Sequence, residues 1–147
     1  MDRARTDTRS KKPVPYPSPE TLPFWEGAKA HRLLLPLCNS CGRFWFPPTQ
    51  RCVHCLSADF VWREASGNGR IYSFVVYHRV YHPAFANDVP YVVALVELDE
   101  GPRLLTNIVG MPPDKVACDM RVRVVFDDYG EDVAVPKFTP LDATTKS

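Results

Sequence analysis

Four of the five cysteines stand in two closely spaced pairs, the arrangement best suited to holding a metal ion. Cys38 and Cys41 form one C-x-x-C pair, and Cys52 and Cys55 form a second pair ten residues further on. Each pair makes a tight turn that presents two sulfurs to one ion, and a short hairpin brings the two turns together. Four thiolates in a tetrahedron leave no open position for water or substrate. The sequence therefore predicts one structural zinc ion per chain.

Other uses of the cysteines remain as alternatives. An iron centre of rubredoxin type has the same ligand set, so the spacing alone does not decide the metal. Disulfides or a redox dithiol are disfavoured, because no secretory signal and no thioredoxin-like alternation of strands and helices is found. His54 lies inside the second cysteine pair and is expected to point to solvent. Cys118 has no second cysteine nearby and is expected to be a small buried apolar residue.

Short β-strands must carry this site, because 15 prolines in 147 residues argue against long helices. Residues 69–138 contain five runs of strand character, separated by turns rich in glycine and proline. An open sheet of five such short strands would expose its edges, so closure into an OB-like barrel is expected. The predicted strands are Arg70–Tyr81, Tyr91–Asp99, Arg103–Val109, Arg121–Asp127 and Val133–Phe138.

An arm and a short helix are predicted before the cysteines. Residues 1–20 are polar and proline-rich, which predicts an extended or disordered arm. Thr21 is the expected N-cap of a helix over Leu22–His31. Phe24 and Trp25 would share an apolar side of that helix. The predicted fold is mainly β. It consists of an arm (1–20), a helix plus rubredoxin-like zinc ribbon (21–66), a five-stranded OB-fold barrel (67–140) and a tail (141–147).

Composition and charge exclude several classes of protein. Hydrophobic residues make up 45% and charged residues 24% of the chain, which is ordinary for a folded protein. No apolar run is long enough to span a membrane, and the chain is expected to be cytoplasmic. Residues 1–12 hold five basic and two acidic side chains, whereas the remainder holds 13 basic and 15 acidic ones. This balance is poor for binding a phosphate backbone. Because OB-fold barrels often bind single strands, a single-stranded nucleic-acid-binding OB-fold protein is nevertheless kept as the alternative function.

Independent catalysis is not expected from the remaining motifs. No histidine stands in a pattern that pairs it with a nucleophile and an orienting carboxylate. His78, Arg79 and His82 follow the first barrel strand, where solvent exposure is the simpler expectation. The turn at residues 66–69 lacks the lysine and helix of a phosphate loop. A free-standing metalloenzyme is disfavoured as well, because the four-cysteine site is full.

An ordered series of motifs runs through the chain: Pro23–Gly27, Cys38–Gly42, Pro47–Pro48, Cys52–Cys55, Trp62, Ser66–Gly69, Tyr72–Phe74, Pro90–Ala94, Glu97–Arg103 and Thr106–Gly110. Over about residues 20–140 this series resembles the zinc-ribbon plus OB-fold proteins grouped as domain-of-unknown-function thirty-five. One departure is Asp119, which stands before Met120 where a glycine is expected. A different local backbone is therefore expected at that position.

The resemblance implies an accessory protein of acyl-CoA metabolism. Members are encoded or fused with thiolases, thiolase-like aldolases, hydroxymethylglutaryl-CoA synthases or hydratases, and the partner carries the chemistry. For this chain it implies a heteromer with a thiolase-like catalytic subunit. The chain would assist binding of a CoA thioester for thiolysis of a 3-oxoacyl-CoA or a related aldol cleavage.

Contacts to acyl-CoA would need aromatic faces for the adenine and a few cations for the phosphates. Phe24 and Trp25 could instead dock a partner, although packing within their own chain is the simpler expectation. The candidate residues for contact with acyl-CoA or with the partner are Phe24, Trp25, Trp45, Trp62, Arg63, Arg70 and Arg79.

Overall fold

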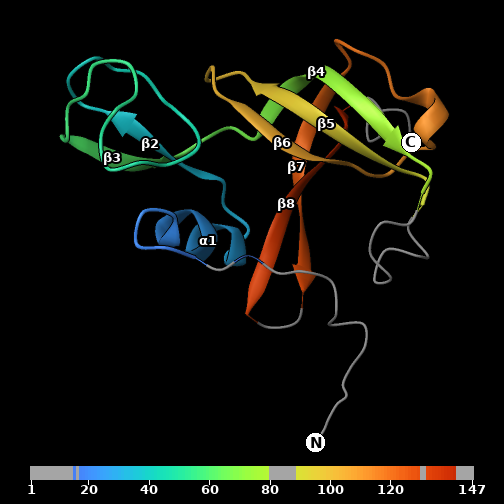
Figure 1. Cartoon of the computed structure of the whole chain (residues 1–147), viewed down its shortest axis with the longest axis horizontal. Coiled ribbons are helices and arrows are strands. Elements are labelled where there is room, and N and C mark those ends of the chain that lie inside the picture. The colour runs from blue at the N-terminus through green and yellow to red at the C-terminus, as the bar shows by residue number, and fades with distance from the viewer. Residues whose placement is uncertain (1–14, 16, 80–88, 130–131, 142–147) are drawn as a thin grey trace, which may run out of the picture.

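The computed structural model describes residues 15, 17–79, 89–129 and 132–141, which form a mainly β protein with one short α-helix (Figure 1). Most of the arm expected over residues 1–20 and nearly all of the expected tail lie outside the described residues. The elements are α1 (Leu22–Lys29), β2 (Leu34–Cys38), β3 (Phe60–Glu64), β4 (Asn68–Tyr77), β5 (Tyr91–Leu98), β6 (Arg103–Ile108), the 3-10 turn η3 (Pro113–Lys115), β7 (Arg121–Tyr129) and β8 (Val133–Pro140).

The five predicted barrel strands are present and close on one another. Their order around the barrel is β4, β5, β6, β8 and β7, and each neighbouring pair is antiparallel except β6 and β8. This closed five-stranded arrangement confirms the OB-fold prediction. The observed strand ends differ from the predicted ones by at most two residues, apart from the end of β4. That strand stops at Tyr77, and the predicted continuation to Tyr81 enters residues that are not described.

Alternation along β5 shows how the sequence fills the barrel. Val92, Ala94, Val96 and Leu98 are buried, while the residues between them are only partly covered. Because successive side chains of a strand point to opposite faces, these four form one wall of the interior. Phe138 closes the opposite side from β8 and is fully buried.

Two tight backbone positions shape the ends of β4 and β7. Gly67 precedes β4 with a φ of 84°, and a Cβ there would lie 2.5 Å from Cγ1 of Val124. Only glycine satisfies both the left-handed backbone and this close approach. Asp119 precedes β7 with a φ of 70°. Asp119, which stands where a glycine was expected, thus has a left-handed backbone. Aspartate tolerates this region better than most residue types do.

The predicted helix forms and packs on the barrel. It spans Leu22–Lys29 and ends two residues before the predicted His31. Thr21 occupies the N-cap but makes no side-chain cap, because its Oγ1 accepts a hydrogen bond from Ser18 N at 2.9 Å. Phe24 is buried in the core, and α1 lies against β8 (Figure 1).

His31, just beyond α1, joins the helix end to the barrel. Its ring stacks on Phe126 of β7 at a centroid distance of 5.2 Å, and its Nε2 lies 2.9 Å from Oδ1 of Asp128. Among the described residues, no helix is long and apolar enough to cross a membrane.

Candidate metal centre

The metal centre is built on the two-stranded sheet of β2 and β3. These strands are antiparallel, with Leu34 opposite Glu64 and Cys38 opposite Phe60. Cys38 ends β2, and the other three cysteines lie in the two turns between the strands. The fold therefore brings together residues 17 positions apart, as the spacing predicted.

The four sulfurs converge on one point. Sγ of Cys38 lies 3.5 Å from Sγ of Cys55, and Sγ of Cys41 lies 3.6 Å from Sγ of Cys52. All four sulfurs lie within 4.8 Å of one another. A tetrahedral site with Zn–S bonds of ~2.3 Å has sulfur–sulfur edges of about 3.8 Å. The cysteine cluster therefore fits a zinc ion without rearrangement.

Backbone amides point at the sulfurs of two of the four cysteines, Cys38 and Cys52. The amides of Ser40 and Cys41 point at Sγ of Cys38 at 3.3 and 3.4 Å, and the amide of His54 points at Sγ of Cys52 at 3.3 Å. The Cys41 amide is the main reason why the pKa of the Cys38 thiol is lowered to about 6. A lowered pKa favours the thiolate, which is the form that binds metal. A bound zinc ion would supply folding free energy to the ribbon and leave no open coordination position.

Trp45 belongs to the small core of the ribbon. It is buried together with Cys38 and Cys52, and its ring meets that of Phe60 edge-on at 5.1 Å. Its Nε1 donates a hydrogen bond to Oγ1 of Thr49 at 3.0 Å. Sequence reasoning treated Trp45 as a surface for stacking, whereas the structure leaves it almost no exposed face. The ribbon is small and has few other large apolar side chains, so Trp45 is needed to form its core.

Two further expectations about this region have opposite outcomes. His54 is exposed, with its Nε2 3.3 Å from the carbonyl oxygen of Phe44, so the prediction that it points to solvent is confirmed. The prediction that Cys118 is buried is wrong, because the residue is exposed in the loop before β7. Val116, two residues earlier, anchors that loop in the core instead.

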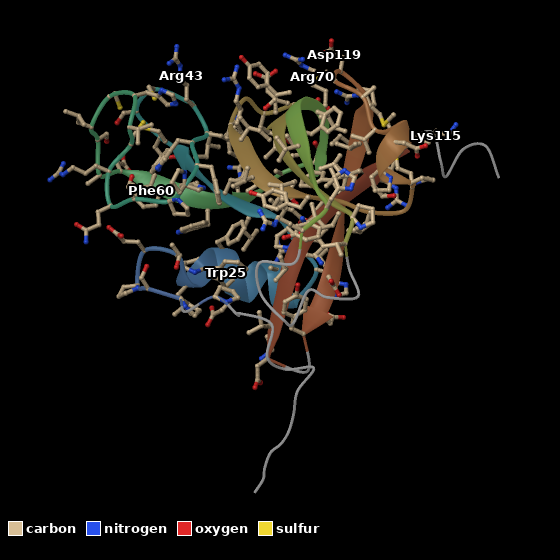
Figure 2. The ribbon with its side chains drawn as sticks, turned by 45° about the vertical axis from the view of Figure 1, so that its right-hand side comes forward. Trp25, Arg43, Phe60, Arg70, Lys115 and Asp119 are labelled. Atoms are coloured by element: carbon tan, nitrogen blue, oxygen red, sulfur yellow. The ribbon has the colours of Figure 1, made fainter. Side chains whose placement is uncertain are left out.

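The aromatic candidates outside the ribbon core serve packing to different extents. Phe24 is buried, whereas Trp25 and Trp62 are partly buried and pack against the barrel core. The rings of Phe24 and Trp25 meet edge-on at 4.8 Å. Figure 2 shows Trp25 on α1, below the ribbon that carries Arg43 and Phe60. Phe24 therefore has no free face, and Trp25 keeps part of its surface.

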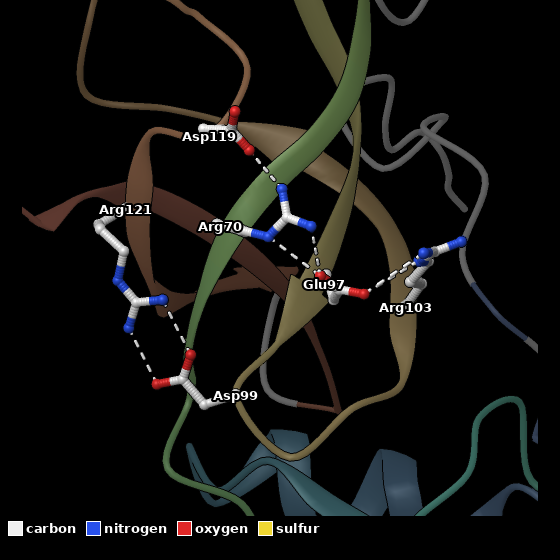
Figure 3. A network of polar contacts seen from close by, with 6 residues as sticks. All are labelled: Arg70, Glu97, Asp99, Arg103, Asp119 and Arg121. Atoms are coloured by element: carbon white, nitrogen blue, oxygen red, sulfur yellow. Dashed lines mark hydrogen bonds and ion pairs between the residues drawn. The ribbon is translucent and has the colours of Figure 1, made fainter.

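The three arginine candidates lie apart from one another. Arg63 is exposed on β3, Arg70 lies near the start of β4, and Arg79 is exposed just beyond the end of β4. Arg70 Nη2 is 2.7 Å from Oε1 of Glu97, and its Nη1 is paired with Asp119. Figure 3 shows that these charges form a network on the outside of the barrel. The structure thus does not gather the predicted cations into one pocket.

The described histidines lack a catalytic arrangement. His31 pairs with Asp128, and Nδ1 of His54 lies 3.3 Å from Nη1 of Arg43. His78 is exposed beyond β4, and His82 lies outside the described residues. Neither of the two partnered imidazoles faces a serine or cysteine nucleophile in these contacts.

A second ionic feature escaped sequence reasoning. Nζ of Lys137 on β8 lies 2.6 Å from Oδ2 of Asp127 on β7, beside a pocket of about 340 Å³. Burial alone would lower the pKa of Lys137, but its contacts with Asp127 and Tyr129 together outweigh burial and raise the pKa. The two residues lie ten positions apart in the sequence, and only the β7–β8 pairing brings them together.

Both the ribbon and the barrel match domains of a known protein family. The rubredoxin-like zinc ribbon domain of ChsH2 matches residues 25–61, and the C-terminal OB-fold domain of ChsH2 matches residues 62–127. A solved chain described as "Ltp2-ChsH2(DUF35) aldolase" is similar to this structure, with a TM-score of 0.78, 41% identity, and coverage of 86% of this chain and 98% of that chain.

Curated relatives are found in bacteria and archaea. A probable enoyl-CoA hydratase alpha subunit of Thermomonospora curvata is 45% identical over 80% of this chain, which spans only 36% of that relative's length. The BbsA subunit of benzoylsuccinyl-CoA thiolase of Geobacter metallireducens is 29% identical over 70% of this chain and 62% of its own length. A DUF35 domain-containing scaffold protein of Methanocaldococcus jannaschii is 34% identical over 80% of this chain and 89% of its own length. The chain belongs to the DUF35 family, with the zinc ribbon and OB-fold domains of ChsH2.

Proposed function

We propose that this chain is a non-catalytic accessory subunit that docks on a thiolase-like catalytic partner and assists binding of acyl-CoA. The partner would cleave or form a carbon–carbon bond, by thiolysis of a 3-oxoacyl-CoA or by a related aldol cleavage. The single observation that carries this proposal is the similarity over 98% of a ChsH2 chain from an aldolase that is described with a second component, Ltp2.

The chemistry of the described residues supports an accessory role. The four-cysteine cluster fits a coordinatively full zinc ion, so the metal would serve structure and not substrate activation. The partnered histidines His31 and His54 are engaged in contacts that hold the fold together. A protein of this kind can act by covering one wall of the partner's pocket, which excludes water and fixes the acyl chain.

The names of the relatives support CoA thioesters as substrates of the complex. One relative is described as a CoA hydratase subunit and another as a CoA thiolase subunit, while the archaeal relative is described as a scaffold protein. Different reactions on CoA thioesters thus accompany one ribbon-and-barrel unit. An accessory subunit is expected to keep the same fold while the reactions of its catalytic partners differ.

A tagged version of the chain, purified from its native host at modest salt, tests this function. Mass spectrometry of the eluate should find a thiolase-like protein in stoichiometric amount, and metal analysis should find one zinc per chain. Recovery of RNA or DNA without a protein partner would contradict the proposal and favour the nucleic-acid alternative.

A further inference from the structure

The outer face of β4, β5 and β6 carries apolar side chains where a water-facing sheet normally carries polar ones. The strand register places Leu95 opposite Leu105, and Val75 opposite Val93. Their sequence neighbours on β5, Val92, Ala94 and Val96, fill the barrel interior, so Val93 and Leu95 point outward. We call the set Tyr72, Val75, Val93, Leu95 and Leu105 the outer apolar face.

Several members of this face are strongly exposed. Leu105 is 70% exposed, Val75 is 55% exposed and Tyr72 is 42% exposed. The register shift between Ile71 and Ser73 breaks the alternation of β4 and leaves both Tyr72 and Ser73 exposed. Large apolar side chains gathered on one sheet face, unlike scattered ones, indicate a surface that a partner covers.

Charged side chains border the face, but they neutralise one another. Glu97 on β5 pairs with Arg70 on β4 at 2.7 Å and with Arg103 on β6 at 3.3 Å, as Figure 3 shows. The guanidinium carbon of Arg103 also lies 3.8 Å from the centre of the Tyr72 ring. Tyrosine and arginine are the residue types enriched where interfaces gain most of their binding energy.

One further arginine and two further carboxylates complete the network. Asp119 pairs with Arg70, and Arg121 holds Asp99 through two bonds of 2.9 Å each. Three arginines thus meet three carboxylates, and these six described residues carry no surplus charge. An occupant that binds through phosphates, such as a nucleic acid or an anionic membrane, would need surplus positive charge here.

We infer that the outer apolar face is the docking surface for the catalytic subunit, and that an uncharged apolar protein surface covers it. This inference rests on the proposed function, because the solved relative is described with a second, different component, which favours a heteromeric occupant over another copy of this chain. The apolar centre and the neutral border call for a matching apolar centre on the partner.

Two pairs of equally exposed residues allow a controlled test. Val75→Lys and Leu105→Lys place a charge on the face, at positions 55% and 70% exposed. Val53→Lys and Leu56→Lys place the same charge on the ribbon, at positions 56% and 69% exposed. All four sites are on the surface, so folding should persist, and zinc content with circular dichroism verifies it for each protein.

The affinity of each variant for the purified thiolase-like subunit is the readout. The face variants should bind at least about 30-fold more weakly than the unmodified chain, and the ribbon variants should bind within about threefold of it. Unchanged affinity of the face variants, or equal loss in both pairs, would overturn the assignment. If the unmodified chain itself captures no thiolase-like subunit, the proposed function fails, and that result is distinct from a failure of this face.

Two further readouts separate the occupants. The affinity should change less than about threefold between 50 and 500 mM salt, because neutral apolar surfaces are hardly screened. A steep salt dependence would overturn the uncharged occupant. Size-exclusion chromatography of the chain alone should give the same mass for the unmodified protein and for Leu105→Lys. A dimer that dissociates in Leu105→Lys would show that a second copy covers the face, which contradicts the inference.

Discussion

At the scale of single residues, the four cysteines and their amide contacts carry the best-defined chemistry of the chain. Cys38 and Cys41 converge with Cys52 and Cys55 because the turns of the ribbon direct all four sulfurs inward. That these four residues converge was predictable from spacing alone, since two C-x-x-C turns have few other stable uses. Burial did not follow from the sequence: Cys118 is exposed although its type is usually buried.

Replacing Cys41 with serine should release the metal and unfold the ribbon. A structural zinc ion supplies about 10 kcal/mol or more of folding free energy in small modules, and three thiolates hold it far less well. Zinc stoichiometry and the fluorescence of the buried Trp45 measure both effects. Cys118→Ser is the matched control and should keep its zinc, because Cys118 lies outside the cluster. A Cys41→Ser protein that keeps stoichiometric zinc and its melting temperature would disprove the structural site.

The Lys137–Asp127 pair should make stability depend on alkaline pH. The pKa of Lys137 is raised in the folded protein, so the pair stabilises the fold at and below the ordinary lysine pKa of about 10.4. This contribution is lost as pH rises through the folded pKa. Lys137→Met should therefore lower the unfolding free energy by about 1 kcal/mol at pH 8. The difference between the two proteins, measured by urea unfolding, should shrink above about pH 10.5; a constant difference would show that packing, and not charge, is responsible.

At the scale of elements, runs of strand character between turn signals predicted the five barrel strands, and their ends agree to within two residues apart from the end of β4. The strands β2 and β3 of the ribbon were not predicted individually, because five residues each give too little periodicity. The outer apolar face also went unnoticed. The sequence did indicate this face, because residues Tyr91–Val96 are all apolar or aromatic. A strand with one solvent-exposed face would alternate apolar and polar residues instead.

The turn into β4 should depend on the absence of a side chain at Gly67. Gly67→Ala combines a left-handed φ of 84° with a Cβ placed 2.5 Å from Val124, so a loss of about 2–3 kcal/mol is expected. Gly101→Ala is the control, because its φ is 116° but no atom lies within 4 Å of its Cβ. Its expected loss is about 1 kcal/mol. Chemical denaturation compares the two, and equal losses would show that the contact with Val124 adds nothing.

At the scale of the whole molecule, the described residues form a zinc ribbon, a short helix and a barrel. The ribbon and the barrel carry different functional features. The ribbon fits a closed metal site, and the barrel presents the outer apolar face with its neutral charged border. Sequence motifs identified the family and suggested the kind of partner that we propose. They could not locate the proposed docking surface, because register and exposure depend on contacts among β4, β5 and β6.

The basic N-terminal arm should be dispensable for this assembly. Residues 1–12 carry five basic and two acidic side chains and lie outside the segment matched by the ChsH2 domains. Deleting them should leave the melting temperature and the affinity for the catalytic subunit unchanged. Thermal unfolding and a binding titration check both values. Loss of partner binding in the shortened chain would show that the arm takes part in docking.

We propose that this chain assists acyl-CoA chemistry without performing it. The most direct test measures carbon–carbon bond cleavage of CoA thioesters by the purified chain, by the purified catalytic partner, and by the two mixed in equal amounts. Turnover should appear with the mixture, weakly or not at all with the partner alone, and never with this chain alone. Turnover by this chain alone, or full activity of the partner without it, would contradict the account.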